Sequence, residues 1–420
     1  MIDSGSTAWM LTASALVLFM TPGLAFFYGG LVRSKNVVST VMYSFVAMGV
    51  VSIIWVLWGY SLAFGPGNNF IGNFDFLGFK DVGYESLAGD GTNPGPLPGV
   101  AVAIPHNAYA IFQMMFAVIT PALITGAFAE RFKFTTYLIF LVLWITFVYA
   151  PIAHWVWAGN GWLFNLGALD YAGGTVVHIN AGVAAIVAAY LVGKRRNPGV
   201  EPHNVPFVVL GAGILWFGWF GFNAGSGLLA NGQAVNAFLV TNTAAAVAAV
   251  VWALLSYMQT KKMSAVGVAS GAVAGLVAIT PASGYVGPMG AMAIGLGAGV
   301  FCYMAVRLRP KLMLDDALDV AAVHGIGGIW GAIATGIFAA SAISGVEAYS
   351  GAIDGHAAQV WIQLRATLAT MGYSFGVTLL ILLVLKHMPG LGLRSSQKAE
   401  DDGLDVSEHG ERAYVRDGAD

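Results

Sequence analysis

Charged side chains are scarce in this chain of 420 residues. Asp, Glu, Lys and Arg together make up only 10% of the sequence, while hydrophobic residues make up 57% and the mean hydropathy is +0.73. A soluble globular domain carries about 25% charged residues. The composition therefore excludes a soluble enzyme, and it is typical of a polytopic helical membrane protein.

Cysteine is almost absent too, because Cys302 is the only one. A single cysteine excludes an intramolecular disulfide and any multi-cysteine metal or redox site. The net charge of −2 gives no reason to expect a nucleic-acid partner. We expect no cofactor, no resident metal ion and no catalytic residues. Basic residues are also missing between Met1 and Thr7, so a cleavable signal peptide is not expected.

Long apolar stretches dominate the rest of the sequence. One membrane crossing needs about 20 residues, and eleven stretches are predicted to be of spanning length. They lie at 8–31, 38–64, 104–128, 135–153, 171–193, 205–227, 235–259, 264–281, 288–306, 320–341 and 358–385. The 55 glycines suit close packing between such helices, because small residues let backbones approach one another. We therefore predict an all-α membrane fold.

Basic residues cluster after every second predicted helix, and this pattern predicts the orientation. The clusters are Arg33 and Lys35, Arg131 and Lys133, Lys194 to Arg196, Lys261 and Lys262, and Arg307, Arg309 and Lys311. Loops rich in Lys and Arg stay on the cytoplasmic side. We therefore expect the N-terminus outside and the C-terminus inside. Arg365 lies within the last apolar stretch, where snorkelling or a salt bridge at a subunit contact would accommodate it.

The chain divides into a membrane domain, residues 1–387, and a polar, acidic tail, residues 388–420. The tail cannot bury a core by itself, and we interpret it as a cytoplasmic regulatory segment. Residues 65–103 form an outer loop between two turn-rich stretches, Gly65 to Gly67 and Pro94 to Gly99. We interpret this loop as a structural connection.

Two histidines, His178 and His324, lie inside apolar stretches of spanning length. Each follows an aspartate by eight residues, since Asp170 precedes His178 and Asp316 precedes His324. Eight helical residues rise about 12 Å, which approaches the ~15 Å half-thickness of a hydrocarbon core. The two helices run in opposite directions in the predicted topology. Both imidazoles are therefore predicted at the same central depth.

This symmetry predicts an inverted repeat, residues 8–193 and 205–341, with the last span, 358–385, outside it. Transporters place substrate at the midplane between such repeats. Two neutral imidazoles can share one hydrogen bond and still offer one ring nitrogen each to a small polar molecule or a proton. The alternative is two unrelated core histidines whose ring nitrogens bond to backbone carbonyls.

Aromatic residues gather near the outer ends of three predicted helices. They are Phe112 and Phe116, Trp155 and Trp157, and Trp216, Trp219 and Phe222, with Ser226 after the last group. Ring faces and a hydroxyl can hold a small cation by contacts of about 0.5–2 kcal/mol. The alternative is an interfacial aromatic belt combined with core packing. No ring of acidic or basic residues is evident for a metal-cation or anion pore.

Several longer motifs are more specific. The run DYAGGTVVHINAG at 170–182 resembles the signature of the ammonium transporter (Amt/Mep/Rh) family, most closely its bacterial Amt branch. Further matching stretches are FYGGLVR at 27–33, GAFAER at 126–131, WFGFNAGS at 219–226 and DVAAVHG at 319–325. The resemblance covers essentially the whole chain.

The resemblance implies ammonium transport across the cytoplasmic (inner) membrane by a homotrimer with one pore per subunit. Carried over residue by residue, it implies a substrate site of Phe112, Phe116, Trp157, Trp219 and Ser226. It implies a pore and gate of Asp170, His178, Phe222 and His324, with Asp316 and Asp319 as structural residues. Independently of the resemblance, the position of Asp170 directly before an apolar helix predicts that it caps the start of that helix.

The implied partners are ammonium or ammonia, membrane lipid and a PII-type signalling protein at the cytoplasmic face. In the expected mechanism, NH4+ binds outside, loses its proton near Asp170 and crosses as NH3 past the histidines. The proton then follows by a separate route, which would make transport electrogenic. The alternatives are an ammonium sensor that signals through its tail and a passive NH3 gas channel. Trp157 and Ser226 disfavour a channel for CO2.

Overall fold

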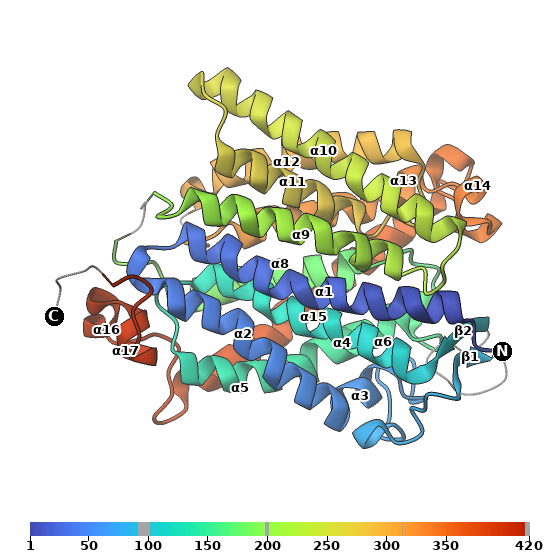
Figure 1. The fold of residues 1–420 in the computed structure, drawn as a ribbon, viewed down its shortest axis with the longest axis horizontal. Coiled ribbons are helices and arrows are strands. Elements are labelled where there is room, and N and C mark those ends of the chain that lie inside the picture. Colours follow the sequence, from blue (N-terminus) through green and yellow to red (C-terminus); the bar gives the residue numbers. More distant parts are fainter. Residues whose placement is uncertain (91–100, 198–200, 313, 416–420) are drawn as a thin grey trace.

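The structure is a bundle of long helices that lie side by side along one axis (Figure 1). It is a computed structural model, and it describes residues 1–90, 101–197, 201–312 and 314–415. The α-helices of the bundle are α1 (Ser4–Leu31), α2 (Val37–Ile54), α3 (Tyr60–Phe64), α4 (His106–Phe128), α5 (Phe134–Trp144), α6 (Ala150–Trp157), α7 (Trp162–Asn165), α8 (Asn180–Val192), α9 (Val205–Gly225), α10 (Gly232–Thr260), α11 (Ala265–Ile279), α12 (Pro288–Leu308), α13 (Gly327–Phe338), α14 (Ser341–Ser344) and α15 (Ala358–His387).

The two ends of the bundle differ in what covers them. The N-terminus and two short strands, β1 (Leu87–Asp90) and β2 (Ala101–Pro105), lie at one end, which we call the loop end (Figure 1). The C-terminal tail with α16 (Gln397–Asp402) and α17 (Leu404–His409) lies at the other, which we call the tail end.

Ten helical segments among the described residues are apolar and long enough to cross a membrane. Each coincides with a predicted apolar stretch. The remaining prediction, 264–281, falls on α11, whose 15 residues are fewer than the ~20 needed for a straight crossing. The second half of α11 is buried, so neighbouring helices cover it. The chain is a polytopic helical membrane protein, as its composition predicted.

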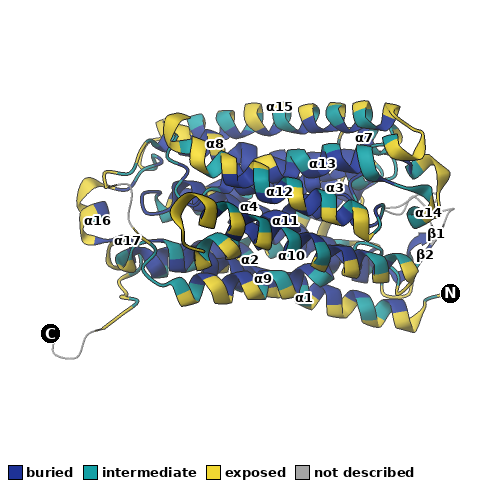
Figure 2. Ribbon diagram, turned by 90° about the horizontal axis from the view of Figure 1, so that it is seen from above, coloured by how far each residue is buried: buried dark blue, intermediate teal, exposed yellow. Residues whose placement is uncertain are grey.

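Residues on the outer faces of the bundle are exposed, while those on the inner faces are buried (Figure 2). Many of the exposed residues have large apolar side chains. Helix α10, for example, exposes Val250 and Leu254, and α15 exposes Leu368, Phe375 and Leu380. Apolar exposure of this extent would be unfavourable in water. These faces therefore suit contact with lipid.

The two halves of the chain meet along α1 and α9, the first helices of the predicted repeats. A Cβ atom added to Gly23, Gly211 or Gly218 would lie 2.6 Å or less from an atom of the facing helix. Glycine is therefore required at this crossing because the backbones approach too closely for a side chain.

Four helical segments contain π-helical turns, η2 (Trp55–Gly59), η4 (Ile145–Tyr149), η5 (Gly174–Ile179) and η7 (Ala321–Ile326). Such turns are rare and are frequently found at functional sites. Two of them carry His178 and His324. They begin four residues after Asp170 and five after Asp316. The prediction of a continuous helical rise from each aspartate to its histidine is therefore wrong.

The outer loop predicted at 65–103 contains an antiparallel hairpin of β1 and β2, which the all-α prediction lacked. Strand β2 takes up the first residues of the predicted span 104–128, so helix α4 begins at His106. The turn predicted at Pro94 to Gly99 lies outside the described residues. The loop is therefore more than an irregular connection.

The tail folds back onto the bundle at the tail end. The carboxylate of Asp405 accepts a hydrogen bond of 2.8 Å from the backbone N–H of Ser39, near the start of α2. Close by, Glu130 forms an ion pair of 2.9 Å with Arg33. Burial raises the pKa of Glu130, but the hydrogen bonds from Arg33 outweigh burial, and the net shift is downward. The tail thus packs beside a charged, well-paired surface.

Candidate functional site

His178 and His324 lie in direct contact in the middle of the bundle. Their Nδ1 atoms are 3.2 Å apart, their ring centroids 5.3 Å, and the rings are inclined by 23°. Both side chains are buried. One Nδ1 donates a hydrogen to the other, so each ring keeps its Nε2 for another partner. The Nε2 of His178 has no hydrogen-bond partner among the described residues.

Close backbone packing brings the two histidines together. A Cβ atom on Gly182 would lie 2.4 Å from Gly325, so η7 crosses α8 at this point without intervening side chains. Gly182 lies one helical turn after His178, and Gly325 directly follows His324. The crossing therefore fixes both imidazoles at the same level.

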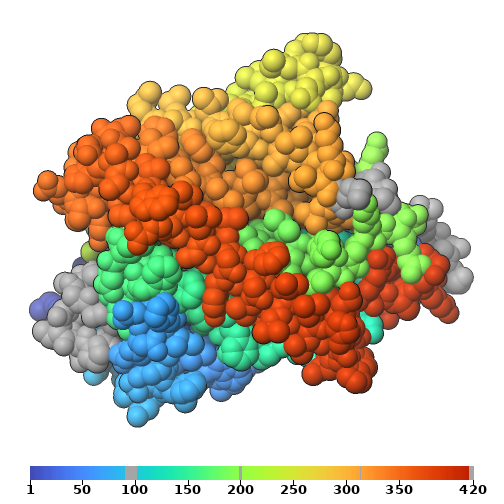
Figure 3. Space-filling view, turned by 180° about the vertical axis from the view of Figure 1, so that it is seen from behind, coloured from blue at the N-terminus to red at the C-terminus, as the bar shows by residue number. Residues whose placement is uncertain are grey.

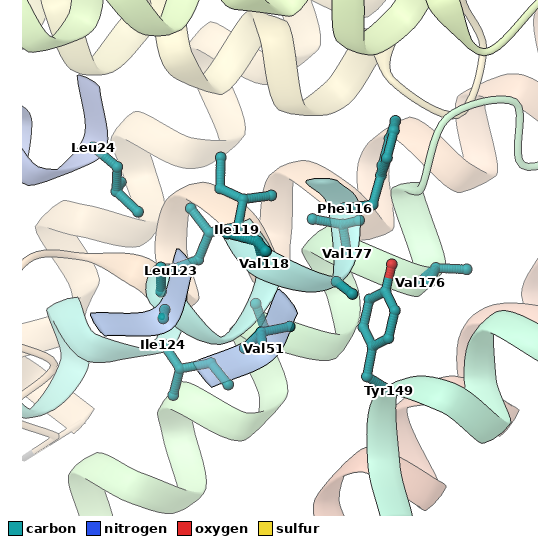
Figure 4. Close-up of a cluster of buried hydrophobic side chains, with 14 of the residues drawn as sticks. Leu24, Val51, Phe116, Val118, Ile119, Leu123, Ile124, Tyr149, Val176 and Val177 are labelled. Carbon is teal, nitrogen blue, oxygen red and sulfur yellow. The ribbon is translucent and has the colours of Figure 1, made fainter. Parts of the chain in front are cut away.

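A cavity of only about 10 Å³ adjoins the histidine pair. Apart from the imidazoles its walls are apolar or aromatic, and Leu24, Ile119 and Leu123 contribute to them (Figure 4). One water molecule needs roughly 10–15 Å³ measured in this way. The passage at the histidines therefore has no room for a hydrated ion.

Two phenyl rings separate this cavity from the loop end. Phe116 and Phe222 have ring centroids 4.4 Å apart, and Phe222 stacks on His178 at 5.9 Å. Trp219 also stacks on His178, at 5.4 Å, and its indole N–H donates to the hydroxyl of Thr280 at 2.9 Å. Trp219 therefore lies beside the histidine pair, below the outer site to which the sequence assigned it.

A second cavity of about 290 Å³ lies on the loop-end side of the phenyl rings. We call it the outer cavity, after the outer site predicted from the sequence. Its lining includes Phe116, Trp157, Asp170, Tyr171 and Ser226. The Phe116 and Trp157 rings meet edge to face at 5.7 Å. The hydroxyl of Ser226 donates to the carbonyl oxygen of Phe222 at 2.9 Å, so its lone pairs can still accept a hydrogen bond.

Phe112 does not belong to the lining of this outer cavity. It is fully buried and packs behind Phe116 at 4.9 Å. The helical spacing of the two residues correctly placed them on one face of α4, but that spacing does not tell which ring reaches the cavity. Phe112 therefore supports the position of Phe116.

Asp170 caps the start of the helical segment that carries His178. Its carboxylate accepts hydrogen bonds from the backbone N–H groups of Gly173, Gly174 and Thr175 at 2.8, 2.6 and 2.8 Å, and another from the Thr175 hydroxyl. Its carbonyl oxygen accepts the indole N–H of Trp157 at 3.0 Å. Asp170 thus holds both a helix start and a ring of the outer cavity.

Asp316 occupies the related position at the tail end. Its carboxylate accepts the backbone N–H of Ala321 at 2.7 Å, and burial raises its pKa. Asp319 pairs with Arg309 at 2.7 Å. Burial raises the pKa of Asp319 to about 7, although the charge of Arg309 opposes this shift. Asp319 also lines a third cavity of about 270 Å³. Phe27 lines both this cavity and the small cavity at the histidine pair.

Two further polar residues near the outer cavity were not predicted from the sequence. Gln113 and Tyr171 line it, and the side-chain oxygen of each is buried without a hydrogen-bond partner among the described residues. Gln113 lies one turn before Phe116 on α4, a spacing that could have indicated its position.

The fold and these cavities define a class of protein: a polytopic membrane protein with a small, mostly apolar cavity at the histidine pair and two wider cavities on either side of it. The chain belongs to the Ammonium Transporter Family, whose model matches residues 8–414. This finding confirms the resemblance seen in the sequence motifs.

Relatives of known name are similar over nearly the full length. An ammonium transporter of Bacillus subtilis is 48% identical over 415 residues, which cover 98% of this chain and 99% of that protein. An ammonium transporter of Aquifex aeolicus is 48% identical over 417 residues, which cover 98% of this chain and 94% of that protein.

Solved structures share the fold. The crystal structure of Saccharomyces cerevisiae Mep2 has a TM-score of 0.86 at 39% identity and covers 94% of this chain and 88% of its own. A structure named Sensor Amt Protein has a TM-score of 0.86 at 32% identity, and the match covers 96% of this chain and 98% of that protein.

Proposed function

We propose that this protein transports ammonium across a membrane through the pore at its histidine pair. The observation that carries the proposal is the contact of His178 with His324 beside an apolar cavity too small for a hydrated ion. Its relatives carry the name ammonium transporter, and transport rather than enzyme catalysis is the proposed activity.

The outer cavity would bind NH4+. The faces of Phe116 and Trp157 attract a cation by contacts of about 0.5–2 kcal/mol. The oxygen of Ser226 accepts one N–H bond, because its own hydrogen is already donated to Phe222. A potassium ion has no hydrogen to donate, so it cannot form this hydrogen bond to Ser226.

The stacked rings of Phe116 and Phe222 would form the gate. A charged species that passes them loses its hydration in an apolar channel, which is costly. Ammonium therefore transfers its proton to water in the outer cavity, which has room for several molecules, and crosses as NH3. The carboxylate of Asp170 already accepts five hydrogen bonds, so it favours the cation through its charge and is poorly placed to take the proton itself.

The histidine pair would guide NH3 and provide the separate route for the proton. The free Nε2 of His178 can accept a hydrogen bond from NH3. The shared Nδ1 contact can pass a proton from one ring to the other. Beyond the pair, NH3 regains a proton in the wider pocket at the tail end.

The proposed setting is an inner membrane crossed eleven times, with the loop end outside and the tail end in the cytoplasm. We further propose a homotrimer surrounded by lipid and regulated at the tail end, with a PII-type protein as the candidate partner. Arg365 is exposed on α15, where it can reach either the lipid interface or a neighbouring subunit.

Charge movement in reconstituted vesicles tests the proposal. Purified protein on solid-supported membranes should give a current with ammonium and none with potassium. Ammonium-driven alkalinisation of the vesicle interior without current would leave a passive NH3 channel. No flux in either assay, and no growth rescue of an uptake-deficient host on low ammonium, would contradict transport and favour the sensor.

A further inference from the structure

Helix α15 lies outside both repeats and crosses the back of the bundle between them (Figure 3). One face carries a stripe of buried polar side chains, spaced three or four residues apart. They are Gln359, Gln363, Thr367, Thr370, Ser374 and Thr378. Polar groups within a spanning helix are costly unless they find partners. The partners of this stripe therefore indicate what α15 does.

Gln363 uses its whole side-chain amide to hold two backbone segments. Its Oε1 accepts the backbone N–H of Leu169 at 2.7 Å, and its Nε2 donates to the carbonyl oxygen of the same residue at 2.7 Å. The Nε2 also donates to the carbonyl oxygen of Ala332 at 3.0 Å. The side chain is 1% exposed. It thus pairs with Leu169 as a neighbouring β-strand would.

Gln359 makes a related contact one turn earlier on α15. Its Nε2 donates to the carbonyl oxygen of Gly167 at 2.9 Å. Helix α13 can approach both glutamines closely, because a Cβ on Gly336 would lie only 3.0 Å from the Cγ of Gln363. Two amides from one helix therefore hold the segment from Gly167 to Leu169.

This segment leads directly into the outer cavity. Gly167, Leu169 and Asp170 all line that cavity, and Asp170 holds both Trp157 and the helix start before His178. Ala332 belongs to α13, which continues from the π-helical turn that carries His324. Gln363 therefore touches both the backbone of the outer site and the helix of the second histidine.

We propose that Gln363 is a positioning residue that sets the affinity of the outer cavity for ammonium, with Gln359 in a lesser role. The inference rests on the proposed function of that cavity. Without the amide, the N–H and carbonyl groups of Leu169 lose their partners, and the segment moves to find others. Asp170 and Trp157 move with it, because they follow in the same hydrogen-bonded chain.

The test compares the half-saturating ammonium concentration with the maximal current in vesicles. Gln363→Leu keeps the approximate size of the side chain and removes its three hydrogen bonds to the backbone, together with a longer one of 3.4 Å from Gln359. It should raise the half-saturating concentration about tenfold, with a smaller change in the maximal current per assembled protein. Gln359→Leu should raise it about threefold, because it removes one bond to the segment, at Gly167, and the longer bond to Gln363. Thr378→Val is the matched control on the same helix, where it removes one bond to Trp144 far from the segment.

Gln363→Glu gives a readout that a general loss of stability would not produce. A protonated carboxyl offers one acceptor and one donor and so imitates the amide toward Leu169, though it lacks the second hydrogen for Ala332, whereas the carboxylate offers no donor. The ratio of the half-saturating ammonium concentration of this variant to that of the parent should stay near one at low pH and rise with increasing pH. Gln363→Glu also serves if the leucine variant fails to assemble.

The results separate this inference from the proposed function. A parent protein without ammonium current would contradict the function itself. A parent with current would contradict the inference alone if Gln363→Leu behaved like Thr378→Val. The same holds if Gln363→Glu showed no dependence on pH relative to the parent.

Discussion

The two aspartates that precede the histidines occupy related positions but differ in their surroundings. Asp170 accepts three backbone N–H groups within 2.8 Å and lines the 290 Å³ outer cavity with aromatic rings. Asp316 accepts one such bond from Ala321, and its Oδ1 has no hydrogen-bond partner among the described residues. Helix capping is therefore common to both ends, while a carboxylate held by several backbone N–H groups is a feature of Asp170.

The repeat therefore determines the geometry of the two ends, and the surroundings of each aspartate determine what its end can bind. Both aspartates stand before a π-helical turn, and both turns deliver an imidazole to the same contact. At the loop end a cation meets the rings of Phe116 and Trp157 beside the charge of Asp170. At the tail end Asp319 lines a cavity together with Trp252 and Tyr303, but its charge is paired with Arg309 and therefore attracts a cation less. Such asymmetry suits binding at one end and release at the other.

Removing Asp170 should have the largest effect. Asp170→Ala leaves the N–H groups of Gly173, Gly174 and Thr175 without an acceptor, and should cost about 3–5 kcal/mol of stability. Transport should be lost with it. Thermal unfolding in detergent and ammonium currents measure the two effects separately. Asp170→Asn retains one acceptor oxygen and should recover much of the stability, but it lacks the charge. Should its half-saturating ammonium concentration equal that of the parent, the charge has no role in binding.

Removing one imidazole should affect selectivity more than folding. His178→Ala and His324→Ala each open a small polar space that water can fill, so assembled protein should remain near the parent level. Ammonium current should fall about tenfold or more, and potassium should begin to pass. Thr335→Val, a buried change on α13 that removes only a bond within the helix, is the control. If both histidine variants carried ammonium as the parent does and still excluded potassium, the proposed role of the pair in transport and selectivity would be refuted.

Much of this architecture could be predicted because hydropathy and equal spacing have direct physical meaning. Apolar stretches located the membrane helices, and the two Asp–His separations indicated that His178 and His324 meet. The helix starts could not be predicted this way. Hydropathy does not show that the carboxylate of Asp170 captures N–H groups and delays the helix to Gly174.

Side-chain neighbours were harder to predict than helices. The family resemblance assigned Trp219 and Phe112 to the outer site, yet Trp219 stacks on His178 and Phe112 packs behind Phe116, so neither lines the outer cavity. Gln363 carried no signal by itself, because its partners lie 194 and 31 residues away along the chain. Such partners become visible only when the helices are packed.

A mild change at Asp316 would sharpen the comparison of the two ends. Asp316 accepts one backbone N–H bond, which an amide oxygen can accept as well, so replacing it with the similarly shaped amide should change little. Asp316→Asn should keep the ammonium current within about twofold of the parent. Asp170→Asn under the same conditions should be clearly weaker. Equal losses in the two variants would mean that the ends are electrostatically alike.

The smallest predicted effect concerns Asp319 and the dependence of stability on pH. Its pKa is raised to about 7 by burial, against an ordinary value of about 3.9 in the unfolded chain. Between these values the folded protein holds a proton that the unfolded chain has lost. The resulting stabilisation is therefore full at low pH and disappears as the pH rises through 7. The side chain is 28% exposed and pairs with Arg309, so solvent screening limits the effect. Unfolding temperatures in detergent between about pH 5 and pH 8 should fall by about 1–2 °C more in the parent than in Asp319→Asn. Identical pH profiles would show that Asp319 stays charged throughout and that its ion pair with Arg309 outweighs burial.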